Sequence, residues 1–316
     1  MRVHLVAVQA HLEPRHYQTS EAFASRVQDL LARSVEGLPE GEPRLVAFPE
    51  AFALPLLFWL ETPPQVREAK TTLQAALLTL KLDWRRVLRL GLPSPSAFYH
   101  LRAETVWPVY QQTFTQAAKA ARAYVVAGSV FSPKIDWEPS RQLHPQGWGV
   151  YNLSLVVSPQ GTVLGRIPKV NLTSHERMAL LNSGQSSQQT LQTQIGILAN
   201  LICLDAFHES LIERADQSGA WLLIQPSANA ARWDGPWSGD KAQIEGEVWL
   251  REGLAKKLVG RENLRYGLNP MLNGQLYELY FEGRSGIYGA GQTLALADSP
   301  VGDTLLRASV EVSRSP

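Results

Sequence analysis

Apolar and polar residues follow two different periods along this chain. Short apolar runs of strand length alternate with longer segments in which apolar residues recur at helical spacing. The short runs predict buried strands at residues 3–8, 44–48, 124–130, 194–203 and 221–225. The helical spacing predicts helices at residues 21–35, 106–123, 206–217 and 243–258.

A hairpin and a group of late strands complete the pattern. Residues 151–158 and 162–166 flank the sequence Pro159-Gln160-Gly161, whose proline and glycine suit a hairpin turn. Further short strands are predicted at residues 277–281, 286–288, 293–297 and 304–310. This alternation predicts a layered α/β protein with sheet inside and helices outside. No linker rich in glycine, serine or proline divides the chain, so residues 1–316 are predicted to form one domain.

Residues 54–102 interrupt this alternation, and we expect a helical insertion there. The segment begins with the apolar run LPLLFWL, and its apolar residues between 66 and 88 fall on one helical face. A surface helix packed on the body of the protein is the simplest interpretation. A cap over a functional site and a contact with a membrane surface stay open as alternatives.

Charge balance and cysteine content narrow the classes of function. The chain carries 30 basic and 29 acidic side chains, a formal net charge of +1, which argues against a nucleic-acid-binding protein that works through a strong positive field. Cys203 is the only cysteine in the sequence, which excludes an intramolecular disulfide and a zinc site built from several cysteines. The sequence has no apolar run long enough to span a membrane and no secretory signal pattern, so a cytoplasmic protein is expected.

Three residues with useful chemistry follow predicted strands. Glu50 comes after RLVAFP and Lys169 after VLGRIP, and in both places proline ends the strand. Cys203 follows IGILANLI and precedes a predicted helix, whose amides would favour the thiolate, the reactive form of cysteine. Each residue alone has a structural explanation, as a strand-end charge or an inert buried thiol. Their combination indicates a catalytic site.

With these motifs the sequence resembles the nitrilase, or carbon–nitrogen hydrolase, superfamily. The resemblance includes LVAFPEAF around Glu50, YNLSLVVSPQGTVLGRIPKVNL around Lys169 and ICLDAFHE around Cys203. It also includes VAVQ, VVAGS, GAWLLIQPSA, GRENLRYGLNP, FEGRSGIYG and GDTLL, so it is spread over most of the chain.

The resemblance implies a four-layer α–β–β–α sandwich and a Glu–Lys–Cys triad. By this resemblance Glu50 is the general base, Lys169 stabilises the oxyanion and Cys203 is the nucleophile. Many members have a second glutamate soon after the lysine, and Glu176 is the candidate here; an ordinary carboxylate at a helix N-terminus is the alternative. The resemblance further implies a homodimer or larger homo-oligomer. The chemistry needs neither a metal nor an organic cofactor.

The expected reaction converts a linear amide or carbamoyl compound to an acid and ammonia through a thioester. Leu204-Asp205 stands where true nitrilases typically have Trp-Glu after the cysteine, which favours an amidase or carbamoylase. Nitrile hydrolysis stays an alternative, because the same thiolate can add to a nitrile carbon. A catalytically weak scaffold or ligand-binding protein on the same fold is a third interpretation, since the residues flanking Lys169 and Cys203 depart from the family pattern.

Overall fold

The larger of two β-sheets is built mostly from the first half of the chain. The computed structural model describes residues 1–91, 96–137 and 143–312. The strands of this sheet are β1 (Arg2–Leu12), β2 (Arg44–Phe48), β3 (Tyr124–Ala127), β4 (Val130–Trp137), β5 (Leu143–Val157), β6 (Val163–Pro168), β11 (Leu272–Leu276), β12 (Leu279–Phe281) and β15 (Thr304–Glu311). Their order is β12-β11-β1-β2-β3-β5-β4, with β15 also paired to β1 and β6 to β5. The neighbours β1, β2 and β3 are parallel, so their carboxyl ends meet at one edge.

The smaller sheet is built from the second half of the chain. Its strands are β7 (Thr190–Thr193), β8 (Gly196–Asn200), β9 (Leu222–Ile224), β10 (Tyr266–Asn269), β13 (Gly286–Gly289) and β14 (Gln292–Leu296). They follow the order β14-β13-β10-β9-β8-β7, and β8, β9 and β10 are parallel. The sheet therefore has a second edge at which carboxyl ends of parallel strands meet.

Helices supply the crossovers that parallel strands require. The α-helices are α1 (Ser20–Val35), α2 (Leu56–Trp59), α3 (Pro64–Arg67), α4 (Thr72–Leu82), α5 (Trp84–Leu90), α6 (Ser96–Ala121), α7 (Ser174–Met178), α8 (Glu209–Gln217), α9 (Glu245–Glu252) and α10 (Leu254–Lys257). The 3-10 helices are η1 (Pro14–His16), η2 (Ser186–Gln188) and η3 (Cys203–Phe207). None of the helices in the described part of the chain is long and apolar enough to cross a bilayer.

Strand β1 shows why both faces of the larger sheet are apolar. Its residues Val6 and Val8 pack in the core that includes Phe23 and Phe114 of α1 and α6. The residues of β1 that alternate with these two, such as Leu5, lie on the opposite face of the sheet and pack in a second core between the two sheets. A strand that is buried on both faces has a continuous apolar sequence.

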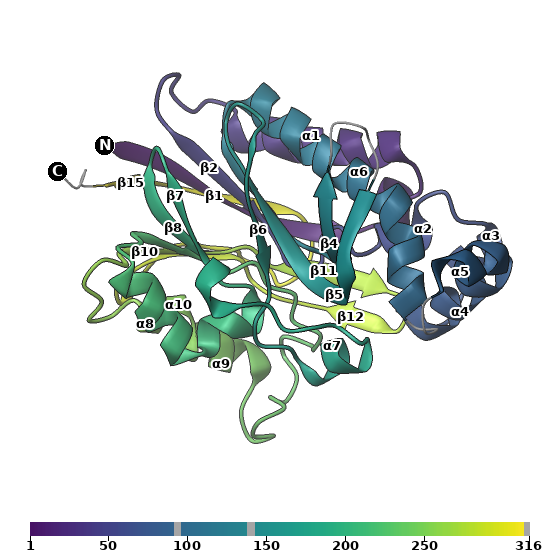
Figure 1. Ribbon diagram of the computed structural model, residues 1–316. Coiled ribbons are helices and arrows are strands. Elements are labelled where there is room, and N and C mark those ends of the chain that lie inside the picture. The colour runs from purple at the N-terminus through teal and green to yellow at the C-terminus, as the bar shows by residue number, and fades with distance from the viewer. Residues whose placement is uncertain (92–95, 138–142, 313–316) are drawn as a thin grey trace.

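A third core completes the layers. Side chains of β8 and β9 that point away from the larger sheet pack against α8 and α10, with Ile212 and Leu254 among the buried residues. Figure 1 shows α1 and α6 outside one sheet and α8, α9 and α10 outside the other. The predicted four-layer α–β–β–α sandwich is thus confirmed.

The segment of residues 54–102 contains α2 to α5 and the beginning of α6, while residues 92–95 lie outside the described residues. The single packed face predicted between residues 66 and 88 is wrong, because several of its large apolar side chains are exposed to solvent. The exposed residues are Leu73, Leu77, Trp84 and Leu88. Three short helices share this stretch, and each change of helix axis breaks the common face.

Arg102 ties α6 to the short helix α2. Its buried guanidinium donates to the carbonyl oxygens of Leu56, Leu57 and Leu60 at 3.1, 2.8 and 2.7 Å. Burial lowers the pKa of Arg102 to about 10. Because α2 follows Glu50 in the chain, these three bonds also fix the backbone that leaves the candidate site.

Candidate active site

Glu50 stands on a tight turn at the carboxyl end of β2. Pro49 ends the strand, and Ala51 has a left-handed backbone with a φ of 57°. The Ala51 N–H donates to the hydroxyl of Ser129 at 2.8 Å, and the Ala53 N–H donates to the carbonyl of Ser129 at 3.1 Å. The connection between β3 and β4 therefore holds the turn that carries Glu50.

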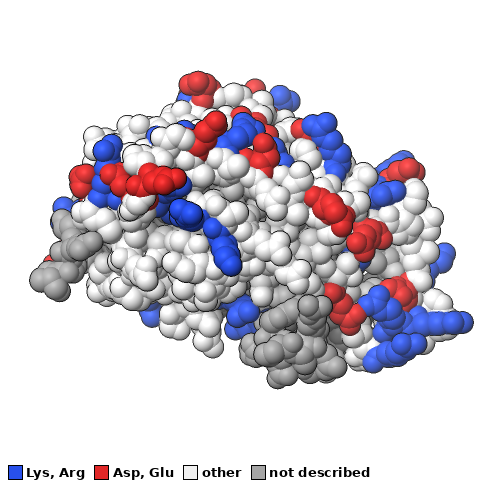
Figure 2. Space-filling view, turned by 90° about the horizontal axis from the view of Figure 1, so that it is seen from above, with Lys and Arg blue, Asp and Glu red and all other residues white. Residues whose placement is uncertain are grey.

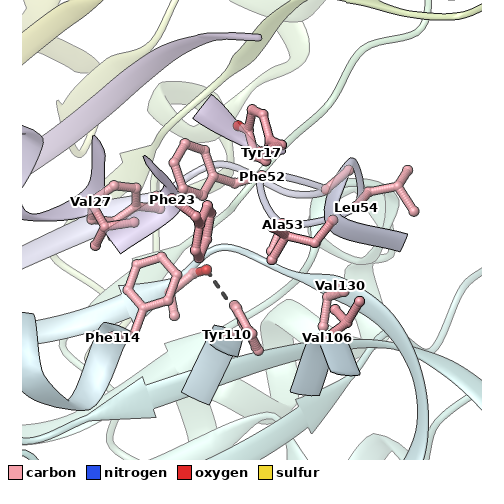
Figure 3. Close-up of a cluster of buried hydrophobic side chains, with 14 of the residues drawn as sticks. Tyr17, Phe23, Val27, Phe52, Ala53, Leu54, Val106, Tyr110, Phe114 and Val130 are labelled. Carbon is pink, nitrogen blue, oxygen red and sulfur yellow. Dashed lines mark hydrogen bonds between the residues drawn. The ribbon is translucent and has the colours of Figure 1, made fainter. Parts of the chain in front are cut away.

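Aromatic packing anchors the same turn in the core. Figure 3 shows Phe52 among aromatic side chains that include Phe23 of α1 and Phe114 of α6. The ring centroid of Phe52 lies 5.1 Å from that of Phe48 and 6.2 Å from that of Phe114. Residues on both sides of Glu50 are thus fixed by the core, which positions its carboxylate.

Gly128 lets the turn approach β3 closely. Its φ is 65°, and a methyl group on its Cα would lie 2.2 Å from the carbonyl oxygen of Pro49. That atom belongs to the backbone directly before Glu50, so it cannot move away without moving Glu50. The motif VVAGS contains this glycine.

Replacement of Gly128 by alanine is expected to destabilise the protein and to lower any activity that depends on Glu50. Gly37→Ala is the matched control, because Gly37 has a φ of 71° with nothing within 4 Å of an added methyl group. The Gly37→Ala control has only the strain of a side chain on a left-handed backbone, about 1–2 kcal/mol. Gly128→Ala has this strain and also a clash with the backbone of Pro49. Urea unfolding of both variants measures the difference, and equal losses would contradict this account.

Lys169 follows β6 and lies between two carboxylates. Its Nζ donates to Glu50 Oε1 and to Glu176 Oε2, both at 2.8 Å. All three side chains are buried, with Lys169 only 1% exposed. The ammonium has three N–H groups. Two are used by these carboxylates, and the described residues supply no acceptor for the third.

Asn152 joins the same two carboxylates from β5, and the sequence analysis missed it. Its Nδ2 donates to Glu50 Oε1 and to Glu176 Oε1, both at 2.8 Å. A fully buried polar residue within the apolar strand sequence YNLSLVV was the available signal, because a buried amide must find partners. Glu50 also accepts a bond at 3.1 Å from the N–H of Ala228, after β9.

Glu176 caps the start of α7 and also contacts Lys169. It forms a capping box with Thr173 at the start of α7, where its Oε2 accepts from the Thr173 N–H at 2.8 Å. The same oxygen accepts the bond from Lys169. The cap holds the glutamate in place, and the glutamate holds the lysine.

Cys203 occupies a strained elbow beyond β8. Its φ is 48°, which is unusual for a residue other than glycine. The N–H of Cys203 donates to the carbonyl of Pro226 at 2.9 Å, and Gln225 Nε2 donates to the carbonyl of Cys203 at 3.1 Å. These bonds come from the residues that follow β9, so neighbouring strand ends maintain the strain. The strand predicted to run to Cys203 instead ends at Asn200, and Cys203 begins η3.

Asp205 links the cysteine elbow to the lysine segment. Its carboxylate is fully buried and accepts from the N–H of Val170 at 3.0 Å and from the N–H and Nδ2 of Asn171 at 2.6 and 2.9 Å. Val170 directly follows Lys169, and Asp205 lies two residues after Cys203. The carboxylate therefore sets the spacing between the lysine and the cysteine.

Replacement of Asp205 by asparagine is expected to lower turnover and to destabilise the protein by about 1–3 kcal/mol, because an amide cannot accept all three bonds. Asp216→Asn is the matched control. Asp216, in α8, accepts backbone N–H bonds from Glu262, Asn263 and Leu264, which lie between α10 and β10. The control should lose stability and keep its turnover number. Unfolding curves and kcat, measured for both, test the assignment; unchanged kcat in Asp205→Asn would refute it.

Electrostatics keep the lysine charged. Burial lowers the pKa of Lys169, but attraction to Glu50, Cys203 and Glu176 outweighs burial and raises its pKa above the ordinary value. Burial raises the pKa of Glu176, and Lys169 together with the hydrogen bonds overcomes this effect, so its pKa is lowered. These shifts favour the ammonium form of Lys169 and the carboxylate form of Glu176.

Glu50 and Cys203 shift in the direction of their uncharged forms. Burial raises the pKa of Glu50, and the nearby charge of Glu176 raises it further, against the pull of Lys169. Burial and the negative charge of Glu50 raise the pKa of Cys203. The predicted acidification of this thiol by helix amides is thus wrong. Both shifts act against ionisation, so they favour the thiol form of Cys203 and weaken the acidity of Glu50.

All four candidates predicted from the sequence, Glu50, Lys169, Glu176 and Cys203, meet at this buried junction of the two sheets. Within residues 1–91, 96–137 and 143–312, no group of three or more histidine, cysteine, aspartate or glutamate side chains is arranged to hold a metal ion. The arrangement brings a thiol, two carboxyl groups and a lysine together in one place.

Solved structures share this fold over almost the whole chain. A carbon–nitrogen hydrolase from Helicobacter pylori G27 matches with a TM-score of 0.66 at 15% identity, over 98% of this chain and 90% of that chain. A branch 10 member of the nitrilase superfamily from Saccharomyces cerevisiae matches with a TM-score of 0.59 at 17% identity, over 98% and 89%. An amidase from Nesterenkonia sp. matches with a TM-score of 0.58 at 20% identity, over 98% and 90%.

Sequence comparisons add no closer relative. No protein-family model matches the chain, and a search of curated proteins finds no match. The structural likeness at low identity defines the architecture, and it agrees with the layers and strand order described above. This chain therefore has the fold of the nitrilase superfamily.

Proposed function

We propose that this protein hydrolyses carbon–nitrogen bonds other than peptide bonds, in a small amide or carbamoyl substrate. One observation carries the proposal: the Lys169 ammonium is clamped between Glu50 and Glu176 and retains one N–H for a ligand. An amide carbonyl is a poor electrophile, so its attack requires such a cation beside a strong nucleophile.

In the acylation step, Glu50 accepts the proton of the Cys203 thiol as the sulfur attacks the carbonyl carbon. The carbonyl π electrons move to oxygen, and Lys169 stabilises the oxyanion. The intermediate collapses when its C–N bond breaks. Glu50 returns the proton to the leaving nitrogen, which departs as ammonia. A thioester on Cys203 remains.

In the deacylation step, Glu50 accepts a proton from water, whose oxygen attacks the thioester carbon. The C–S bond then breaks, the sulfur regains a proton and the acid is released. A related structure supports a nucleophilic role for the cysteine: a mutant of the Nesterenkonia sp. AN1 amidase shows covalent addition of the acetamide moiety of fluoroacetamide at its active site cysteine. Glu176 and Asn152 hold the base and the lysine in position.

Ammonia release tests the proposal directly. Wild type and Cys203→Ala are compared on aliphatic amides, aromatic amides, carbamoyl amino acids and nitriles, with circular dichroism to establish folding. We expect release from an amide or carbamoyl class that disappears in Cys203→Ala. Asp216→Asn serves as a folded control that should keep the activity.

Three other outcomes would contradict the proposal. Release from nitriles alone would indicate a nitrile hydrolase. Release that persists in Cys203→Ala would exclude this nucleophile. A folded wild type that releases no ammonia from any class would favour the scaffold or ligand-binding interpretation.

A further inference from the structure

The helices α4 and α5 carry large apolar side chains on their solvent side. Leu73 and Leu77 of α4 are 65% and 54% exposed, whereas the small residues Ala75 and Thr79 are buried. Trp84 and Leu88 of α5 are 54% and 71% exposed, and Leu82, the last residue of α4, is 49% exposed. A surface helix normally buries its large apolar residues. Leu78 and Leu80 of α4 do pack against the core, but the exposed leucines and tryptophan leave an apolar surface uncovered, which we call the α4–α5 face.

Basic side chains accompany this face. Lys81, Arg85 and Arg89 are exposed, and the described residues provide no ion-pair partner for any of them. Arg86 differs, because it pairs with Asp83 at 2.9 Å and also with Glu104. Figure 2 shows basic side chains gathered at the end of the molecule where Figure 1 shows α4 and α5. Since the whole chain has a net charge of only +1, this positive surface is a local feature.

Hydrogen bonds attach the start of α4 and the segment before it to the body of the protein. The N–H of Thr72, at the start of α4, donates to Glu278 Oε2 at 2.8 Å, and the Tyr277 hydroxyl donates to the carbonyl of Val66 at 2.8 Å. Tyr277 and Glu278 lie in the turn between β11 and β12. The exposed side chains are thus presented by anchored helices.

Charge decides between the partners that could cover this face. A second copy bound through the same surface would bring the three exposed cations of one copy against those of the other, which costs free energy. An acidic soluble partner would pair with the cations but would not bury the exposed leucines and tryptophan. The interface of an anionic bilayer satisfies both, because apolar and indole side chains enter the boundary region while cations meet the headgroups.

We propose that the α4–α5 face docks this protein reversibly on the surface of an anionic lipid bilayer. The helices would lie in the plane of the interface, with Leu73, Leu77, Trp84 and Leu88 inserted and Lys81, Arg85 and Arg89 at the headgroups. This proposal is independent of the reaction catalysed.

Vesicle co-sedimentation with the full chain tests it. Phosphatidylcholine vesicles with and without about one third phosphatidylglycerol are compared at low and high salt. Arg85→Gln/Arg89→Gln removes charge, and Leu77→Ser/Leu88→Ser removes apolar surface. Their matched controls are Lys119→Gln/Lys241→Gln and Val259→Ser/Val301→Ser, which change exposed residues of the same kinds elsewhere.

We expect binding to anionic vesicles, little binding to neutral ones, and release at high salt. Each α4–α5 variant should lower the partition coefficient about tenfold or more, while both controls bind like wild type. Absence of binding to anionic vesicles would overturn the proposal, and so would equal losses in the control variants. A concentration-dependent dimer that the Leu77→Ser/Leu88→Ser variant abolishes would show that a second copy covers this face instead.

Discussion

Lys169→Met is expected to abolish measurable turnover and to destabilise the fold by about 3–5 kcal/mol, because it leaves two buried carboxylates without their cation. The loss of the oxyanion partner alone should cost about 10²–10³ in kcat. The stability loss should depend on pH. Without the ammonium, the pKa values of Glu50 and Glu176 rise above those of the unfolded chain, so the variant is most stable in acid and loses stability as pH rises.

Urea unfolding between acid and neutral pH, together with ammonia release, measures both effects. Lys119→Met is the matched control, because Lys119 is an exposed lysine of α6 and its replacement should change stability by less than about 0.5 kcal/mol. A Lys169→Met protein as stable as this control at neutral pH would show that the carboxylates do not depend on the lysine.

Glu50→Gln is expected to lower kcat about 10²–10⁴-fold, because the variant cannot accept the proton of Cys203. The wild-type rate should fall as pH decreases through the raised pKa of Glu50, above the ordinary carboxyl value of 4.5. This acid limb should be absent from Glu50→Gln. Its residual rate should increase toward alkaline pH, where the thiol of raised pKa ionises without a base.

Glu176→Gln distinguishes the two carboxylates. Because the charge of Glu176 raises the pKa of Glu50, its removal should shift the acid limb to lower pH without abolishing it. The pH dependence of kcat/KM, recorded for wild type and both variants, is the measurement. An acid limb that vanishes in Glu176→Gln and persists in Glu50→Gln would exchange the roles of the two residues.

Local sequence patterns predicted elements of the fold well where a single pattern, such as an apolar run or helical spacing, covered the whole element. The apolar run ending at Pro49 predicted β2 with its bounds, and helical spacing predicted α1 to within a residue. Glycine divided elements that the apolar pattern had joined. Gly128 separates β3 from β4, and Gly253 separates α9 from α10. Helix α6 begins ten residues earlier than predicted, because tertiary packing buries its first turns.

The candidate site was predictable only in part, because several of its contacts join segments distant in the chain. Strand ends marked Glu50, Lys169 and Cys203. Glu50 and Cys203 follow the parallel strands β2 and β8, whereas Lys169 follows β6, which pairs antiparallel with β5. The bonds from Asn152 to both glutamates depend on the register of β5, which no local signal specifies. The charge state of Cys203 was also beyond local inference, because burial and Glu50 determine it.

The position of β1 has a consequence for synthesis of the chain on the ribosome. Residues 2–9 of β1 pair with residues 304–311 of β15, and β1 contributes side chains to two of the three cores. One edge of β1 is therefore paired only after β15 has been synthesised. Closing so long a loop is slow, and an apolar strand with a free edge can pair with other chains meanwhile. Nascent chains that stop before residue 304 should therefore depend on chaperones to stay out of aggregates.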